Sequence, residues 1–535
     1  MKLNDELEYL KLSKWQKFVY RFKSFFTSIP KKLGNGFLKI GHFFKKCGLA
    51  IANEAKDIWT TFVNGDWKTK VSYLVMGFGS IARGQILRGI LFFLMEVVFI
   101  GYMVLMGGYY LSKLPTLGTE HAKVIETSVG RGVQKTIDPN FPGDNSFQIL
   151  LYGVLTLFFI IAFIYTWRVN IKQNKLAEQI IKSGKKLKSG KDDLRSLVDD
   201  QFHKTLLALP TMGILIFTVM PIVFMILVAF TSYDSLHIGK DTMQWVNFGE
   251  EGLFHWVGLD NFRTLLTWQG SGGANYAATF GEILLWTLIW AFFATFTNYF
   301  LGILVAMAIN KKGIQLKKVW RTILIMTIAI PQFISLLYVA RMFNPNGLIN
   351  GFLHDLGILK QGIDIDWLQS QNTDNPTMAR IMVIIINIWI GIPYLMLIAT
   401  GILMNIPADL YESAKIDGAS GWKQFSKITM PYMLFITGPY LLTSFTGNMN
   451  NFNVIYLLTG GNPKFSNGGM GSPGKTDLLI TWLFKMTQSG QGGETSAAKY
   501  NMASVIGILV FVVVSVISLI VYGLLPSVKN EEDYQ

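Results

Sequence analysis

Charged residues are scarce in this 535-residue chain: 15% are Asp, Glu, Lys or Arg, whereas 51% are hydrophobic. A soluble protein of this size carries about a quarter charged residues. Hydrophobic runs long enough to cross a bilayer, which takes about 20 residues, recur along the chain. These features exclude a single large soluble core and predict an all-α integral membrane protein.

Cysteine is almost absent, since Cys47 is the only one, and this excludes an internal disulfide and a cysteine-rich metal site. The six histidines are scattered without the paired spacing of a metal site. No carboxylate pair stands with a nucleophile, so we expect no catalytic constellation, no metal and no cofactor, and the chain is not predicted to be an enzyme. Residues 1–70 lack the core and cleavage site of a signal peptide, so we expect them to stay attached.

Eight membrane spans are predicted, and the formal net charge of +14 sets their orientation. An excess of base is typical of nucleic-acid binding or of the positive-inside bias of membrane proteins. Lys and Arg gather beside the spans, which indicates the second cause and no nucleic-acid partner. We therefore expect a multi-pass membrane protein with both termini in the cytoplasm. The spans lie at about 86–111, 147–167, 206–230, 282–310, 319–343, 379–403, 432–456 and 502–525.

The spans and linkers indicate five regions. A basic cytoplasmic region (1–70) precedes two additional N-terminal transmembrane helices (71–167), in which the apolar stretch 71–82 is too short to cross. A Lys-, Ser- and Gly-rich cytoplasmic linker (168–204) leads to a six-helix core (205–528) and a short cytoplasmic tail (529–535). Glu96 lies inside the first span, where an acid is a functional candidate. We interpret it as structural, meeting a neighbouring helix or Arg88.

The cytoplasmic loop 409–431, between the sixth and seventh spans, predicts a helix–turn–helix. Asp409 stands where it can cap a first helix, with Glu412 three residues later as in a capping box. Gly418 supplies a turn that favours positive φ. A second short helix is expected from about residue 420 to 428. Pro431 then starts the next span, where its missing N–H costs little.

This loop closely resembles the EAA motif of ABC importer permeases, which reads Glu-Ala-Ala, three residues, Gly, nine residues and Ile-x-Leu-Pro. The loop departs from it at two positions only, with Ser for the second residue and Met for Leu. The resemblance implies that the loop docks into a groove on an ATPase subunit and transmits nucleotide-driven closure to the spans. The matching coupling positions are Glu412, Ser413, Ala414, Gly418, Ile428 and Pro431.

Uncharged polar residues interrupt the sixth and seventh spans. Ser444, Asn448 and Asn451 follow the spacing i, i+4, i+7 and so share one face of a helix, and Asn387 lies in the span before. Amides in a membrane need a partner or a wet cavity. Their spacing alone is compatible with a sugar site, since sugar hydroxyls donate and accept, or with hydrogen bonds between helices.

The core from about 200 to 525 resembles the larger membrane subunit of bacterial maltose/maltodextrin importers, a type I ABC importer permease of six helices. Matching segments include 387–391, 393–394, 444–445, 450–452 and 476–479. The external loop 231–281 is much shorter than in the enterobacterial form. The resemblance implies a mid-membrane sugar pocket formed by the positions matching Asn387, Ile390, Gly391, Tyr394, Ser444, Asn448, Asn451 and Gln332.

The resemblance also implies the machine. We expect a permease in the lipid bilayer of the bacterial cell membrane that forms a heterodimeric channel with a second permease. Two ATP-binding subunits and an extracytoplasmic sugar-binding protein are the further partners. The cargo expected is maltose or maltodextrin. The alternatives are another oligosaccharide, such as a galacto-oligosaccharide or a pectin fragment, or an ion-coupled secondary transporter. The last class places charges near the membrane midplane, whereas only Glu96 is central here and it lies outside the six-helix core.

Overall fold

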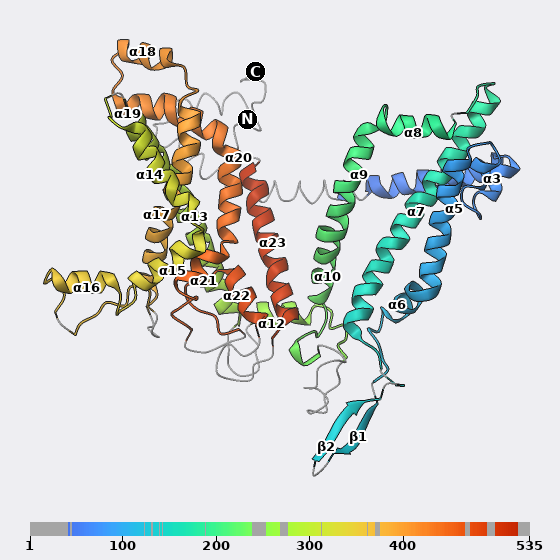
Figure 1. Cartoon of the computed structure of the whole chain (residues 1–535), viewed down its shortest axis with the longest axis horizontal. Coiled ribbons are helices and arrows are strands. Elements are labelled where there is room, and N and C mark those ends of the chain that lie inside the picture. Colours follow the sequence, from blue (N-terminus) through green and yellow to red (C-terminus); the bar gives the residue numbers. More distant parts are fainter. Residues whose placement is uncertain are drawn as a thin grey trace, which may run out of the picture. The chain divides into compact units, whose positions relative to one another are not determined.

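The chain folds as two compact units, shown in the computed structural model of Figure 1. The N-terminal unit comprises Met1–Tyr109 and Leu155–Ile214, and the core unit comprises Tyr110–Val154 and Leu215–Gln535. The structure describes residues 41–42, 45–121, 123–129, 132–138, 140–141, 143–187, 189–237, 253–267, 276–311, 313–360, 362–369, 375–465, 471–488 and 498–522.

Six helices or helix runs of the described residues are long and apolar enough to cross a membrane. A seventh candidate is a bent pair, α14 (Lys317–Ala329) and α15 (Gln332–Met342), which meet at 92° next to Pro331. The predicted span 432–456 is two helices, α20 (Met430–Met449) and α21 (Phe452–Leu458), separated at Asn450 and Asn451. The count of eight spans therefore stays a prediction. The six runs are Ile86–Lys113, Ser146–Lys182, Phe202–Val228, Tyr276–Asn310, Thr377–Leu403 and Tyr500–Tyr522.

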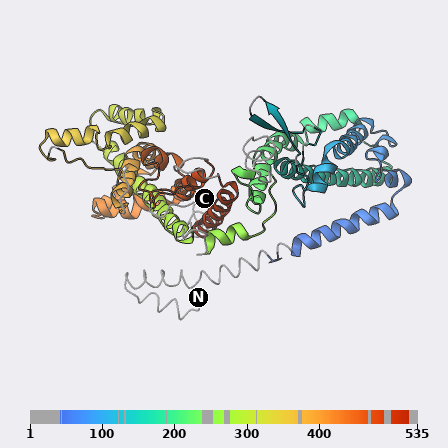
Figure 2. The ribbon, with the colours of Figure 1, turned by 90° about the horizontal axis from the view of Figure 1, so that it is seen from below.

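The N-terminal unit contains a helix over residues 45–64, which Figure 1 shows crosswise to α5 and Figure 2 shows along the outer edge of the unit. Two short helices follow, and the rest of the unit is built from long ones. The labelled helices are α3 (Trp67–Val71), α4 (Phe78–Ile81), α5 (Ile86–Tyr102), most of α7 (Ser146–Lys182), α8 (Gly190–Val198) and α9 (Phe202–Ile214). A π-helical turn (Met103–Gly107) joins α5 to α6 (Gly108–Lys113).

A buried polar network holds α3 and α4 against α7. The Arg83 side chain is 1% exposed and donates to Asp66 at 2.5 Å and to Asn174 of α7 at 2.7 Å. Asp66 also caps α3 by accepting from the N–H of Thr69. The stretch 71–82 therefore folds back as a helical hairpin because its polar backbone finds partners inside the unit.

Glu96 takes part in the same unit. Its Oε2 atom accepts the N–H of Met76 at 2.8 Å, so it contacts the hairpin that precedes α5. An ionisable side chain facing the apolar layer is costly unless it is paired. This contact supports the structural interpretation of Glu96.

The hairpin contains two glycines with positive φ, and one of them lies directly against α5. Gly77 has φ +81°, and a Cβ atom there would lie 2.0 Å from the carbonyl oxygen of Gly89 in α5. Gly84 has a similar φ of +87°, but a Cβ atom there would meet nothing within 4 Å. Only the first position requires glycine both for its backbone conformation and for space.

We predict that Gly77→Ala destabilises the protein more than Gly84→Ala. Both variants carry the left-handed backbone strain of about 1–2 kcal/mol, but Gly77→Ala must also push α4 from α5, a further cost of about 1–3 kcal/mol. The melting temperature of the full chain in detergent measures the difference. Equal melting temperatures for the two variants would contradict the close approach.

The core unit is a helical bundle with a small hairpin. Its further helices are α10 (Met220–Val228), α12 (Asp260–Leu266), α13 (Tyr276–Asn310), α16 (Leu348–Asp355), α17 (Thr377–Leu403), α18 (Ala408–Ile416), α19 (Gly421–Gln424), α22 (Leu479–Met486) and α23 (Tyr500–Tyr522). Shorter turns are π-helical (Leu215–Val219 and Phe425–Thr429) or 3₁₀ (Ser235–His237). The all-α prediction omitted one feature, the antiparallel hairpin of β1 (Val124–Val129) and β2 (Gly132–Ile137), in which Val124 pairs with Ile137.

Helix α13 lies at the centre of the bundle, where it packs against both α17 and α20. Trp286 and Trp290 join the cluster that includes residues of α17 and α21, and Tyr299 joins the cluster of α17 and α20. The Tyr299 hydroxyl also shares a hydrogen bond of 2.8 Å with Thr437 of α20. Since its buried side faces both neighbours, α13 fixes the relative position of the two helices that carry most predicted site residues.

Two ion pairs fasten the loops of the core unit. Lys485 of α22 bonds the buried Asp477 at 2.7 Å and the carbonyl of Gly460 at 2.6 Å, which closes the loop between α21 and α22. Asp234 bonds Lys499 at 2.7 Å and His237 at 2.6 Å. Burial alone raises the pKa of Asp234, but the hydrogen bonds from His237 and Lys499 outweigh it and lower this pKa to about 2. The carboxylate therefore stays charged and holds the residue 231–237 loop beside the start of α23.

Candidate functional site

Polar side chains of α13, α17 and the α20–α21 junction form a polar stripe, defined here as Thr295, Asn298, Asn387, Asn448 and Asn451. Thr295 and Asn298 lie three residues apart on α13, and both are buried. They were not among the predicted site residues. Their spacing of three residues in a long and mostly apolar helix was the available signal.

Asn298 is seated against Gly391 of α17. A Cβ atom at Gly391 would lie 2.2 Å from Asn298 Nδ2, so the amide occupies the space that glycine leaves. One turn further along both helices, Leu395 of α17 occupies the corresponding space at Gly302 of α13. These reciprocal contacts set the register of two helices that run in the same direction, as expected for the fourth and sixth spans of an alternating topology.

Asn387 lies one turn before Gly391 on the same side of α17 and is buried. Its Nδ2 atom and the Oδ1 atom of Asn298 are buried without a hydrogen-bond partner in the part of the chain that the structure describes. A buried polar atom left unpaired costs about 1–3 kcal/mol. One donor and one acceptor of the stripe therefore have unused hydrogen-bonding capacity.

Asn448 and Asn451 lie together at the end of α20. Asn448 donates from Nδ2 to Thr295 Oγ1 at 3.0 Å, and its backbone carbonyl oxygen accepts from Trp290 Nε1 at 3.0 Å. Asn451 donates to Asn448 Oδ1 at 3.4 Å and caps α21 by accepting from the N–H of Val454. Hydrogen bonds between helices, one of the two alternatives at the sequence level, are thus present in this group, and the sugar site stays a prediction.

The remaining predicted positions differ in exposure. Ser444 of α20 is half-buried and hydrogen-bonds the Tyr440 side chain one turn before it, and Tyr394 is half exposed. Ile390 packs against the cluster around Trp286 and Trp290. Tyr394 and Ser444 therefore present an aromatic ring and a hydroxyl at the surface of the core unit beside the polar stripe.

Gln332 stands apart from these residues. It is the first residue of α15, directly after the break at Pro331, and it is exposed. No hydrogen bond joins it to the polar stripe among the described residues. Its predicted role at a pocket wall stays a prediction.

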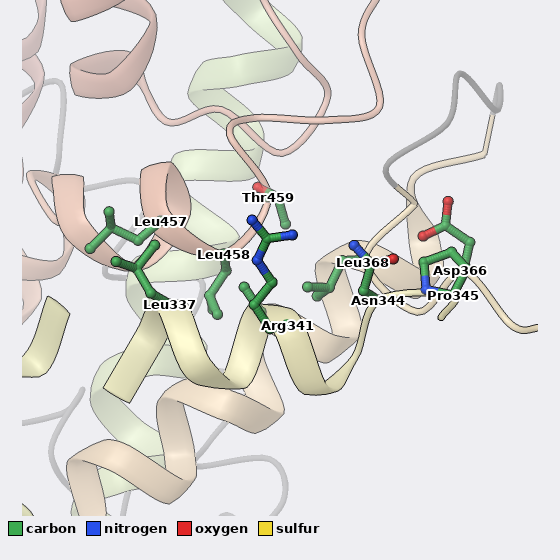
Figure 3. A pocket seen from close by; sticks show the side chains of 10 residues that line it. Leu337, Arg341, Asn344, Pro345, Asp366, Leu368, Leu457, Leu458 and Thr459 are labelled. Carbon is green, nitrogen blue, oxygen red and sulfur yellow. The ribbon is translucent and has the colours of Figure 1, made fainter. Parts of the chain in front are cut away.

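A separate pocket of about 250 Å³ lies between α15, the segment 366–368 and the end of α21 (Figure 3). Four leucines line it, and the Arg341 guanidinium points toward Thr459 (Figure 3). Asp366 supplies a carboxylate further along the rim. None of the predicted sugar-binding residues lines this pocket, so it is distinct from the polar stripe.

The predicted coupling loop is a helix–turn–helix, with one correction. The first helix, α18, begins at Ala408 after Pro407, and Asp409 lies in its first turn, so the expected capping box of Asp409 and Glu412 is wrong. Pro407 already sets the extended backbone that precedes a helix. Gly418 has φ +71°, which is the positive φ expected at the turn.

The second arm of the loop is longer than expected. Ser420 caps α19 by accepting from the N–H of Lys423, and the π-helical turn Phe425–Thr429 continues directly into α20. Tyr411 of α18 shares a hydrogen bond of 2.9 Å with Thr429, which ties the two arms together. The coupling loop therefore begins a continuous helical path that ends at Asn448 and Met449.

Large apolar side chains are exposed on this loop. Ile416 at the end of α18 is 87% exposed, and Trp422 of α19 is 75% exposed. Such residues away from the membrane spans are typical of a surface that docks a protein partner.

The sequence pattern of the family described as binding-protein-dependent transport system inner membrane component matches residues 298–529. The maltodextrin transport system permease protein MalC of Streptococcus pneumoniae serotype 4 is 31% identical over 474 residues, which cover 87% of this chain and 97% of MalC. This chain belongs to that permease family. The permease is thus a transport subunit of the membrane and not an enzyme, and the predicted resemblance and fold class are confirmed.

Two further similarities lie in the same class. The galactooligosaccharides transport system permease protein GanP of Bacillus subtilis is 32% identical over 399 residues, which cover 74% of the permease and 87% of GanP. The crystal structure of a bacterial ABC transporter involved in the import of the acidic polysaccharide alginate has a TM-score of 0.46 and 22% identity, and covers 62% of the permease and 97% of that chain.

We predict that Gly391→Ala destabilises the permease, whereas Gly401→Ala on the same helix does not. The first substitution forces Asn298 from its position, at a cost of about 1–3 kcal/mol. A Cβ atom at Gly401 meets nothing within 4 Å, and alanine favours the helix. Thermal unfolding in detergent measures both variants. A Gly391→Ala variant as stable as wild type would mean that the two helices are not in close contact there.

Proposed function

We propose that this permease imports a linear α-glucan, maltose or maltodextrin, by ATP-driven alternating access. It forms the translocation pathway with a second permease, two cytoplasmic ATP-binding subunits power it, and an extracytoplasmic binding protein delivers the sugar. The observation that carries this proposal is the continuous helical path from Gly421 to Met449. It joins the coupling loop directly to Ser444 and Asn448.

The chemistry of the polar stripe suits a neutral, hydroxyl-rich cargo. Asn387 offers a buried unpaired donor and Asn298 a buried unpaired acceptor, and a sugar hydroxyl both donates and accepts. Tyr394 adds an exposed aromatic ring beside them. Apolar and aromatic walls with a few placed polar groups are typical of small-molecule sites. We assign substrate contact to Asn298 and to the predicted positions Asn387, Ile390, Gly391, Tyr394, Ser444, Asn448, Asn451 and Gln332.

Coupling runs through the loop 409–431. Ile416 and Trp422 are the exposed apolar residues that an ATPase groove would cover. The coupling positions Glu412, Ser413, Ala414 and Gly418 lie on or beside α18, and Ile428 and Pro431 lie where the second arm enters α20. ATP-driven closure of the ATPase dimer would move both arms together because Tyr411 and Thr429 join them.

The orientation follows from charge. We place the loop, the linker 168–204 and both termini in the cytoplasm, since Lys and Arg gather in these segments. The regions 1–70, 71–167, 168–204, 205–528 and 529–535 keep the roles predicted for them. Galacto-oligosaccharide import by the same machine is the second candidate cargo, favoured by the similarity to GanP.

We predict that labelled maltotriose enters cells that hold the permease and its partner subunits, and that Ser444→Ala with Asn448→Ala lowers the uptake about 30-fold. Two neutral hydrogen bonds of about 1 kcal/mol each account for this factor. Galactotriose is measured in parallel. Uptake of galactotriose alone would reject the maltodextrin cargo and keep the machine.

Two controls separate sugar contact from packing. Thr295→Val removes the buried hydroxyl that accepts from Asn448 but leaves the Asn448 side chain in place, so most of the uptake should remain. Thr443→Ala alters an exposed neighbour of Ser444 and should leave uptake unchanged. If Thr295→Val lowers uptake as far as the double variant, Asn448 acts through packing and the assigned site is wrong.

We predict that Gly418→Asn abolishes ATP-dependent uptake while the permease still inserts and folds. Asparagine tolerates positive φ better than other side chains, and a side chain at Gly418 meets nothing in the permease itself. Gly357→Asn is the matched control, with φ +70° and equally open space. Copurification of the ATPase and uptake are both measured. Wild-type uptake in the Gly418 variant would contradict docking at this turn.

A further inference from the structure

The 45–64 helix of the N-terminal unit is attached through its polar side. Glu54 bonds Arg168 of α7 at 2.5 Å and Lys172 at 2.7 Å, and Asp57 bonds Lys175 at 2.5 Å. These pairs turn one side of the helix toward α7. In a water-soluble amphipathic helix the apolar side faces the protein instead.

The apolar side of this helix faces away from the protein. Ile51 is 70% exposed and Trp59 is 66% exposed, Val63 is exposed as well, and Phe62 is 37% exposed with one edge against the Tyr73 ring. Residues 51, 55, 59 and 62 are spaced three to four apart, so they lie along one arc of the helix. This arc, together with Val63, is called the apolar arc below.

The contacts with α7 fix the depth of the helix. Arg168, Lys172 and Lys175 follow directly after Trp167, where the apolar stretch of α7 ends. This is the level at which a span leaves the hydrocarbon and enters the headgroup region. Trp59 lies near this level, since it stacks on Phe62, whose ring meets Tyr73, and Tyr73 meets Trp167. Tryptophan is enriched at that boundary. Figure 1 shows the helix crosswise to α5, as expected for a helix in the plane of the interface.

Lysines accompany the apolar arc. Lys45, Lys46 and Lys56 are exposed, and at 100° per residue Lys45 and Lys56 fall at its edge. An amphipathic helix with Trp and Phe on one side and Lys on the polar side is the pattern of interfacial anchors. Lysines at this level attract anionic headgroups.

We propose that the 45–64 helix is an interfacial anchor that binds anionic phospholipid, with its apolar arc among the acyl chains and its lysines at the headgroups. Glu54 and Asp57 position it by holding its polar side to α7. Its assignment to the cytoplasmic leaflet rests on the orientation proposed above. Its insertion depends only on the contacts within the N-terminal unit.

The test measures depth in the membrane with spin labels. The single native cysteine is removed by Cys47→Ser, and Ile51→Cys or Phe62→Cys places a nitroxide on the apolar arc of the full chain. Asn53→Cys, exposed on another side of the same helix, is the matched control. The proteins are placed in nanodiscs of phosphatidylcholine alone or with an equal part of phosphatidylglycerol. Power saturation then compares access of oxygen with access of a water-soluble nickel chelate.

The labels at residues 51 and 62 should favour oxygen, and the label at residue 53 should favour nickel. Phosphatidylglycerol should increase the membrane depth of the labels at residues 51 and 62. The triple substitution Lys45→Gln, Lys46→Gln and Lys56→Gln should remove this increase. Equal nickel access at all three sites would overturn the proposal, and so would shielding of residues 51 and 62 from both reagents, which a protein cover produces. Depths that do not respond to phosphatidylglycerol would overturn the anionic-lipid part. No sugar or nucleotide is present, so failure of the transport proposal does not affect this result.

Discussion

Hydrocarbon offers no water to a polar group, so each polar atom at membrane depth must be satisfied within the protein or face a wet cavity. In the N-terminal unit Arg83 bonds both Asp66 and Asn174, and Glu96 accepts a backbone N–H. Both units still contain buried polar atoms without a partner among the described residues, Arg83 Nε in the first and Asn298 Oδ1 and Asn387 Nδ2 in the core unit. The two unpaired amide atoms of the core unit are the ones that the proposed function assigns to the sugar.

The polar stripe lies on helices that also reach the predicted coupling loop. Asn448 is tied to α13 through Thr295, and α20 leads from Asn448 back through a π-helical turn to α19. Such π-helical turns are frequent at functional sites. A displacement of the loop is therefore not absorbed by a flexible linker on its way to the polar stripe. On the proposed mechanism, this rigidity lets nucleotide-driven closure reach the sugar contacts.

Much of this architecture was predictable because the bilayer constrains the hydropathy and the charge distribution of the sequence. The long spans and the turn at Gly418 followed from run length and from the need for positive φ. The capping box at Asp409 was wrong because Pro407 places the helix start two residues earlier, at Ala408. The β1–β2 hairpin was missed because a short segment between two spans lacks the length of signal that a span provides.

Asn298 shows why the site was only half predictable. Its spacing from Thr295 was the one signal in the sequence, because its position depends on Gly391, which lies far along the chain and leaves room for the amide. Leu395 fills the gap at Gly302 one turn later. Slipping one helix along the other by a turn would drive Leu395 into Asn298 in one direction and would leave Gly391 facing Gly302 in the other. Packing volume at these two glycines thus holds the register of α13 and α17, and the hydrogen bond from Asn448 to Thr295 ties α20 to them. A sequence read one residue at a time reveals its polar members but not the two glycines that align them.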